Sequence, residues 1–139
     1  MTAVALAAAA VLFGIAAMHL YWAAGGRTGA LAAVPERSGR PAFTPRPLAT
    51  ITAGLAFALA GGIVLARASL WELPGVSSGL VKVATWGIGA IFLLRAIGDF
   101  RLVGFFKRAR GTRFARFDSR LYSPLAFAVG VAVCWLASR

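Results

Sequence analysis

Few side chains in this 139-residue chain are able to carry out acid–base or metal chemistry. There is one histidine, His19, one cysteine, Cys134, and a total of four carboxylates. A histidine exchanges protons near neutral pH and can also bind a metal ion or a ligand. A haem site with paired histidines would need a second histidine, and a disulfide relay would need a second cysteine. The sequence therefore predicts no metal site and no bound cofactor.

Two pairs of polar residues have the four-residue spacing that brings side chains to one face of a helix. The first pair is Arg95 with Asp99, and the second is Asp118 with Tyr122. One interpretation is structural: Arg95 and Asp99 neutralise each other, and Asp118 stabilises the first turn of a helix. The alternative is that Arg95 binds a phosphate or carboxylate while Asp99 orients that ligand or His19. Residue types alone leave both interpretations open.

The elements that must position these side chains are long apolar runs. Apolar residues make up 60% of the chain, whereas soluble domains contain about 45–50%. A helix needs roughly 20 residues to cross the hydrocarbon layer of a membrane. The sequence predicts an all-α fold, a membrane-spanning four-helix bundle in a single domain of residues 1–139, with helices at about 3–25, 47–66, 83–106 and 121–138.

The first and third of these runs need separate comment. The first has the length of a signal peptide, but no Lys or Arg precedes its apolar part, so we expect a retained helix. The third is free of charge only over 83–94 and reaches an adequate length by continuing through Arg95 and Asp99 to about Phe106. Charges cost about 2.5–3.5 kcal/mol each at the centre of a membrane helix. We therefore expect these charges near one end of the third helix.

Rows of small residues in the second and fourth runs predict close helix packing. The rows recur every four residues: Thr50, Gly54, Ala58, Gly62 and Ala66 in the second run, and Ala126, Gly130, Cys134 and Ser138 in the fourth.

Basic residues predict the orientation in the membrane. All but three of the 15 fall in the first and third loops or at the end of the third helix; the exceptions are Arg67, Lys82 and Arg139. Cytoplasmic loops of membrane proteins carry an excess of Lys and Arg. We therefore expect a multi-pass protein of the bacterial inner membrane with both termini on the periplasmic, outer side.

This topology brings most of the chemically capable side chains to one level, just inside the cytoplasmic boundary. We expect a ligand site there, for an anionic or quinone-like headgroup, formed by His19, Tyr21, Trp22, Arg95, Asp99, Asp118 and Tyr122.

The segment from Phe100 to Tyr122 alternates aromatic and basic residues, a pattern typical of chains in the headgroup layer. Its predicted contacts with anionic headgroups are Arg101, Lys107, Arg108, Arg110, Arg113 and Arg116. Membrane lipids are therefore the expected partners, together with a membrane-protein partner or a second copy of the chain. Nucleic acid is not expected despite the net charge of +11, because the basic residues lie between apolar runs.

Four blocks of sequence together resemble an uncharacterised bacterial family of small four-helix integral membrane proteins, known as a domain of unknown function. The blocks are residues 19–26 (HLYWAAGG), 95–101 (RAIGDFR) with 104–107 (GFFK), 114–118 (FARFD) and 122–125 (YSPL). The resemblance extends over nearly the whole chain. It implies a four-helix inner-membrane protein, and it implies no activity, substrate or catalytic residue.

The function that follows from these observations is that of a non-catalytic membrane component. No phosphate-binding glycine loop, catalytic triad or zinc-protease motif is present. The chain is then an accessory subunit of a membrane complex, or a protein that binds lipid or quinone headgroups. The alternatives are a small enzyme that moves a proton on a lipid-soluble substrate through His19 or Asp99, and an oligomeric transporter.

Overall fold

The computed structural model describes residues 1–37 and 39–139 and is almost entirely helical. Four long helices are apolar enough to cross a membrane, which confirms the all-α class and identifies a multi-pass membrane protein. They are α1 (Thr2–Ala23), α3 (Pro47–Arg67), α4 (Ser78–Ile97) and the run Arg113–Ser138, which ends in α6 (Ser123–Ser138). The shorter elements are α2 (Ala30–Ala33), β1 (Glu36–Arg37), β2 (Arg40–Pro41), α5 (Arg113–Phe117) and a π-helix, η1 (Asp118–Tyr122).

The first two long helices lie close to their predicted bounds, but α4 is displaced toward the N-terminus. It begins at Ser78, and the side chain of Ser77 caps this end by accepting a hydrogen bond from the backbone N–H of Leu80. It ends at Ile97, so the predicted continuation to Phe106 is wrong. Gly98, with φ 90° and ψ −170°, turns the backbone out of the helical conformation. The helix therefore reaches a membrane-spanning length by extending toward the N-terminus, past Lys82 to Ser78.

The last helical run starts before the predicted residue 121. It extends without a break from Arg113 to Ser138 through α5, η1 and α6. Thr112 caps its start by accepting a hydrogen bond from the N–H of Ala115. A proline inside a helix displaces the carbonyl group of the residue four positions earlier. The wider π-helical turn directly before Pro124 accommodates this displacement.

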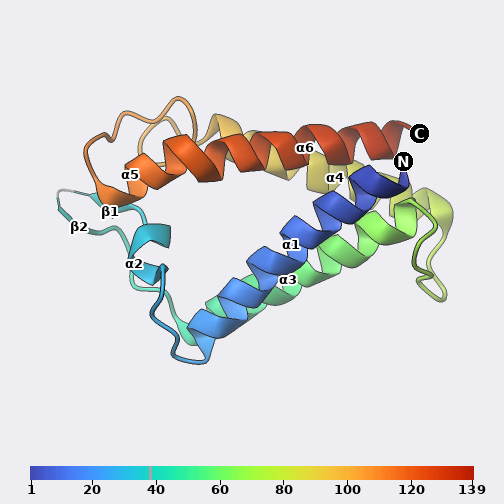
Figure 1. Ribbon diagram of the computed structural model, residues 1–139, viewed down its shortest axis with the longest axis horizontal. Coiled ribbons are helices and arrows are strands. Elements are labelled where there is room, and N and C mark those ends of the chain that lie inside the picture. The colour runs from blue at the N-terminus through green and yellow to red at the C-terminus, as the bar shows by residue number, and fades with distance from the viewer. Residues whose placement is uncertain (38) are drawn as a thin grey trace.

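The four long helices form two hairpins, α1 with α3 and α4 with α6, and packing is far more extensive within each hairpin than between them. In Figure 1 the hairpins converge at the end that contains both termini and diverge toward the other end, where α2, β1 and β2 lie between them. We call this open end, formed by residues 24–37, 39–46 and 98–112, the basic end.

Glycines allow close helix approach within each hairpin, although not all at the predicted positions. A Cβ atom added at Gly61 would lie 2.9 Å from Cε1 of Phe13, and one added at Gly54 would lie 3.2 Å from Cβ of His19. The predicted contact at Gly62 is wrong, because nothing lies within 4 Å of its added Cβ. In the other hairpin, the row through Gly130 does form a helix contact, since an added Cβ would lie 2.8 Å from Cγ of Leu93.

The interior is made mostly of small and aliphatic side chains together with Phe92, and most other large side chains point outward. Leu12, Val64, Val133 and Leu136 are fully buried where the hairpins converge. Many leucines and isoleucines on the outer faces are exposed; Leu48, for example, is 75% exposed. An apolar exterior around a small-residue interior is the arrangement expected of helices in lipid.

Candidate functional site

The side chains predicted to form one ligand site separate into two groups at the basic end. Arg95 and Asp118 belong to an ion-pair cluster in the α4–α6 hairpin. His19 and Trp22 line a cleft beside the α1–α3 hairpin. The remaining three predicted residues, Tyr21, Asp99 and Tyr122, form hydrogen bonds that hold loops in place.

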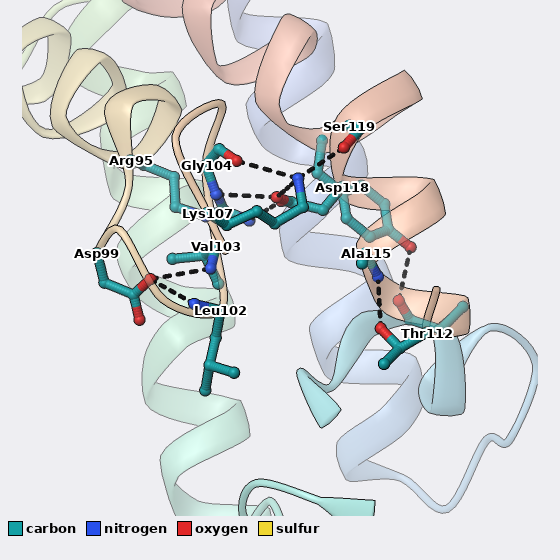
Figure 2. Close-up of polar contacts among 12 residues, drawn as sticks. Arg95, Asp99, Leu102, Val103, Gly104, Lys107, Thr112, Ala115, Asp118 and Ser119 are labelled. Atoms are coloured by element: carbon teal, nitrogen blue, oxygen red, sulfur yellow. Dashed lines mark hydrogen bonds and ion pairs between the residues drawn. The ribbon is translucent and has the colours of Figure 1, made fainter. Parts of the chain in front are cut away.

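The ion-pair cluster is centred on Asp118, which is 0% exposed (Figure 2). One carboxylate oxygen, Oδ1, accepts a hydrogen bond from Nη2 of Arg95 at 2.7 Å. The other, Oδ2, accepts from the backbone N–H of Gly104 at 2.8 Å and lies 2.9 Å from Nζ of Lys107. Asp118 thus connects the end of α4, the loop after it and the start of the last helical run.

Lys107 is a buried structural residue, which corrects its prediction as a lipid-headgroup contact. Its side chain is 4% exposed. Besides facing Asp118, Nζ donates to the carbonyl oxygen of Gly104 at 3.0 Å and to Oγ of Ser119 at 2.7 Å. All three ammonium protons therefore have an acceptor within the protein. The other predicted headgroup contacts are exposed: Arg101, Arg108, Arg110, Arg113 and Arg116.

The predicted pairing of Arg95 with Asp99 is wrong. Because α4 ends at Ile97, Asp99 does not lie one helical turn beyond Arg95, and Arg95 pairs with Asp118 instead. The Asp99 carboxylate turns inward on its own loop. Its Oδ1 accepts hydrogen bonds from three consecutive backbone N–H groups, at 2.9, 2.7 and 3.0 Å, those of Arg101, Leu102 and Val103.

These contacts change the acidity of Asp99. Desolvation raises the pKa of the carboxyl group, but the N–H donors of Val103, Arg101 and Leu102 lower it more, so its pKa lies below the ordinary value of 3.8. A lowered pKa means that the ionised form stabilises the fold. That contribution is present at neutral pH and is lost as the pH falls through the lowered pKa. Asp99 therefore remains a charged loop cap at neutral pH and is unsuited to act as a base there.

The cleft beside the α1–α3 hairpin has a volume of about 910 Å³. Its wall comes from the ends of α1 and α3 and from the intervening loop, with Arg113 contributed by α5. Most of the lining is apolar, and its charged residues are Glu36, Arg46 and Arg113. The lining includes His19, Trp22, Leu31, Val34, Glu36, Phe43, Arg46, Ala53 and Arg113.

The hydrogen bond of His19 determines which ring nitrogen is left to accept a hydrogen bond. Nδ1 lies 2.8 Å from the carbonyl oxygen of Ile15. A carbonyl oxygen only accepts, so Nδ1 carries a proton, and in the neutral ring Nε2 retains its lone pair. The ring is partly buried between Trp22 and Phe57, with centroid separations of 5.3 and 5.2 Å. His19 therefore offers the cleft a fixed imidazole with one acceptor nitrogen.

Three aromatic residues fix the loop that closes this cleft. Trp22 donates from Nε1 to the carbonyl oxygen of Thr28 at 2.8 Å, and Tyr21 donates to Oγ1 of the same residue at 3.2 Å. Tyr122 donates to the carbonyl oxygen of Ala32 at 3.3 Å and so connects α2 to the last helical run. Tyr21 and Tyr122 do not line the cleft and hold its surrounding loops instead.

Several cleft residues were not predicted from the sequence, among them Val34, Glu36, Phe43 and Arg46. They lie in a segment without helical periodicity. The one sequence feature that points to its structure is the set of prolines near Phe43, which favours an extended chain. These prolines are Pro41, Pro45 and Pro47. Within residues 1–37 and 39–139, no three His, Cys, Asp or Glu side chains gather closely enough to bind a metal ion.

Comparison with known proteins gives a family match for most of the chain. Residues 12–133 match the family described as a protein of unknown function, DUF3995. No curated protein and no solved structure matches the chain.

Proposed function

Since the chain belongs to the DUF3995 family of unknown function, we propose from its own geometry that it is a non-catalytic membrane protein that binds a lipid-soluble amphiphile. The observation that carries this proposal is the cleft of about 910 Å³ at the basic end. Ligand pockets of proteins have volumes of about 300–1,000 Å³ and are mostly apolar with a few polar groups. The cleft has both properties.

The polar groups of the cleft favour a particular kind of headgroup. Arg46 and Arg113 attract an anionic or strongly hydrogen-bonding group. His19 offers an acceptor nitrogen, which suits a hydroxyl donor such as that of a reduced quinone. The apolar side chains Leu31, Val34 and Phe43 then accommodate the start of the tail. As an accessory subunit, the protein would present this ligand to a membrane-protein partner or to a second copy of itself.

The orientation that goes with this proposal places the basic end in the cytoplasm of a bacterial cell and both termini outside the inner membrane. In a Cys134→Ser background, Val76→Cys should react with a membrane-impermeant maleimide on intact spheroplasts. Arg108→Cys should react only after the cells are permeabilised. The reverse labelling pattern would place the cleft in the outer leaflet and contradict the orientation.

Filling the cleft should remove its ligand without unfolding the protein. Ala53 lines the cleft on α3, whereas Ala56, one turn farther along the same helix, is exposed and does not line the cleft. We expect Ala53→Phe, purified in mild detergent, to retain at most about one tenth of the amphiphile that the wild-type protein retains. A tenfold loss corresponds to about 1.4 kcal/mol of binding free energy. Ala56→Phe should retain the wild-type amount. Lipid extraction and mass spectrometry measure the ratio of ligand to protein.

Equal retention by the two phenylalanine variants would contradict the proposal, as would a wild-type protein that carries only bulk membrane lipid. The co-purified compound also identifies the chemical class of the ligand directly.

A second candidate function is proton transfer on the same lipid-soluble compound. The Nδ1 hydrogen bond of His19 favours it, because Nε2 is left as a base at the cleft wall. The two functions predict different fates for the ligand. If wild-type protein converts the co-purified compound into an isomer or tautomer and His19→Gln does not, the protein is an enzyme. If the compound is recovered unchanged with both, the binding function stands.

A further inference from the structure

A second, smaller hollow lies at the basic end and shares no lining residue with the cleft. Its volume is about 230 Å³, below the roughly 300 Å³ at which pockets begin to accept drug-sized molecules. The hollow is too small for a quinone ring with its tail, and it suits a compact headgroup. Its walls come from the loop after α4 and from the α5–η1 segment.

The charges around this hollow are all positive and mostly uncompensated. Arg110, Arg116 and Arg120 line it together with the buried Lys107. In the described part of the chain, both ion pairs involve Asp118, which is occupied by Arg95 and Lys107. None of the three arginines has a carboxylate partner there. Arg116 and Arg120 also lie about one helical turn apart, a spacing at which like charges repel.

We propose that this hollow is a binding site for a phosphate group, held by the guanidinium groups of Arg110, Arg116 and Arg120. A planar guanidinium group donates two parallel hydrogen bonds to phosphate oxygens and remains charged at every physiological pH. A bound phosphate anion would also reduce the mutual repulsion of the three side chains.

Lys107 and Ser119 have supporting parts in this site. The ammonium group of Lys107 is fully committed to Asp118, Gly104 and Ser119 (Figure 2). It therefore adds positive potential to the floor of the hollow without touching the phosphate. Oγ of Ser119 accepts from Lys107, which leaves the Ser119 hydroxyl proton free to donate.

The surroundings of the hollow favour a phospholipid as the source of the phosphate. Phe105 lines it and is 45% exposed, and the neighbouring Phe106 is 63% exposed. Exposed aromatic rings beside arginines are typical of the headgroup layer of a membrane. This site differs from general attraction of the basic loops to anionic lipid, because it includes Arg120 and leaves out Arg101, Arg108 and Arg113.

Phosphate binding can be tested with two variants that lose equal charge. The site variant carries Arg110→Gln, Arg116→Gln and Arg120→Gln, and the control carries Arg37→Gln, Arg101→Gln and Arg108→Gln, all at exposed positions. Detergent-solubilised wild-type protein and both variants are titrated with short-chain phosphatidylglycerol, glycerol phosphate and inorganic phosphate. Phosphorus NMR line widths measure binding, and circular dichroism checks that each variant is folded.

We expect the site variant to bind phosphatidylglycerol at least about tenfold more weakly than wild type and the control to change by less than about twofold. Binding of the lipid alone identifies a headgroup site, and equal binding of the soluble phosphates identifies a general phosphate site. Equal weakening in the two variants would show diffuse attraction and overturn the proposal, as would undiminished binding by the site variant. Ala53→Phe should leave phosphate affinity unchanged, so the cleft and this site are tested separately.

Discussion

Replacing Asp118 with leucine is expected to destabilise the folded protein by about 3–5 kcal/mol, the usual cost of removing one partner from a buried ion pair. Asp118 is 0% exposed and Lys107 is 5% exposed. Without the carboxylate, the Lys107 ammonium group remains buried beside only neutral acceptors. The N–H of Gly104 also loses its acceptor. Arg95 suffers less, because its side chain is 35% exposed and can turn toward the headgroup layer.

The double variant Asp118→Leu with Lys107→Met separates charge from packing. Removing both charges eliminates the uncompensated ammonium group, so the double variant should recover at least about half of the lost stability. Reversible unfolding in mixed micelles, followed by circular dichroism, gives the free energies of unfolding. If the double variant is as unstable as Asp118→Leu, the cluster stabilises the fold through the shape of its side chains and the electrostatic account is wrong.

Replacing Gly98 with alanine is expected to cost roughly 2–6 kcal/mol, as the sum of backbone strain and steric overlap. With φ 90° and ψ −170°, Gly98 occupies a region that is open essentially to glycine alone. A Cβ atom there would also overlap the carbonyl group of Val103 and the backbone of Gly104. The loop would have to move, and with it the N–H of Gly104 that binds Asp118.

Gly111→Ala is the matched control for this second prediction. Gly111 also has a positive φ, of 85°, but nothing lies within 4 Å of its added Cβ. Its substitution should therefore cost only the strain, about 1–3 kcal/mol. The same unfolding measurement in mixed micelles compares the two variants. Equal losses would mean that the loop yields to the extra methyl group at no cost, and that the close approach of Gly98 to Gly104 does not matter for stability.

The membrane spans could be predicted from the sequence because their signal is composition over about 20 residues. The bounds of α4 could not. The charge of Lys82 predicts that the helix begins after it, although a long side chain near a helix end can extend to the membrane surface while its backbone stays helical. With that start, the helix reaches a membrane-spanning length only by continuing through Gly98, where the backbone in fact leaves the helix.

The candidate site was harder to predict because its contacts join distant residues. Helical spacing paired Arg95 with Asp99, whereas the true partner, Asp118, is 23 residues away and is reached only after the loop turns back. The positions of Gly98 and Gly104 in that loop were the available signal. The cleft was predicted only at His19 and Trp22, since the rest of its wall is an irregular segment held by hydrogen bonds from Trp22 and Tyr122.

The unequal packing of the two hairpins also determines how the molecule divides into cooperative units. Units that open together tend to coincide with supersecondary motifs whose contacts are mostly internal. The α4–α6 hairpin encloses the entire Asp118 cluster, all of whose members lie within residues 95–119. Each hairpin can therefore complete its own contacts as it enters the bilayer, before the two meet. We expect the smaller contact, the one between the hairpins, to open before the contacts within each hairpin, and this opening would move Arg113 away from the rest of the cleft wall.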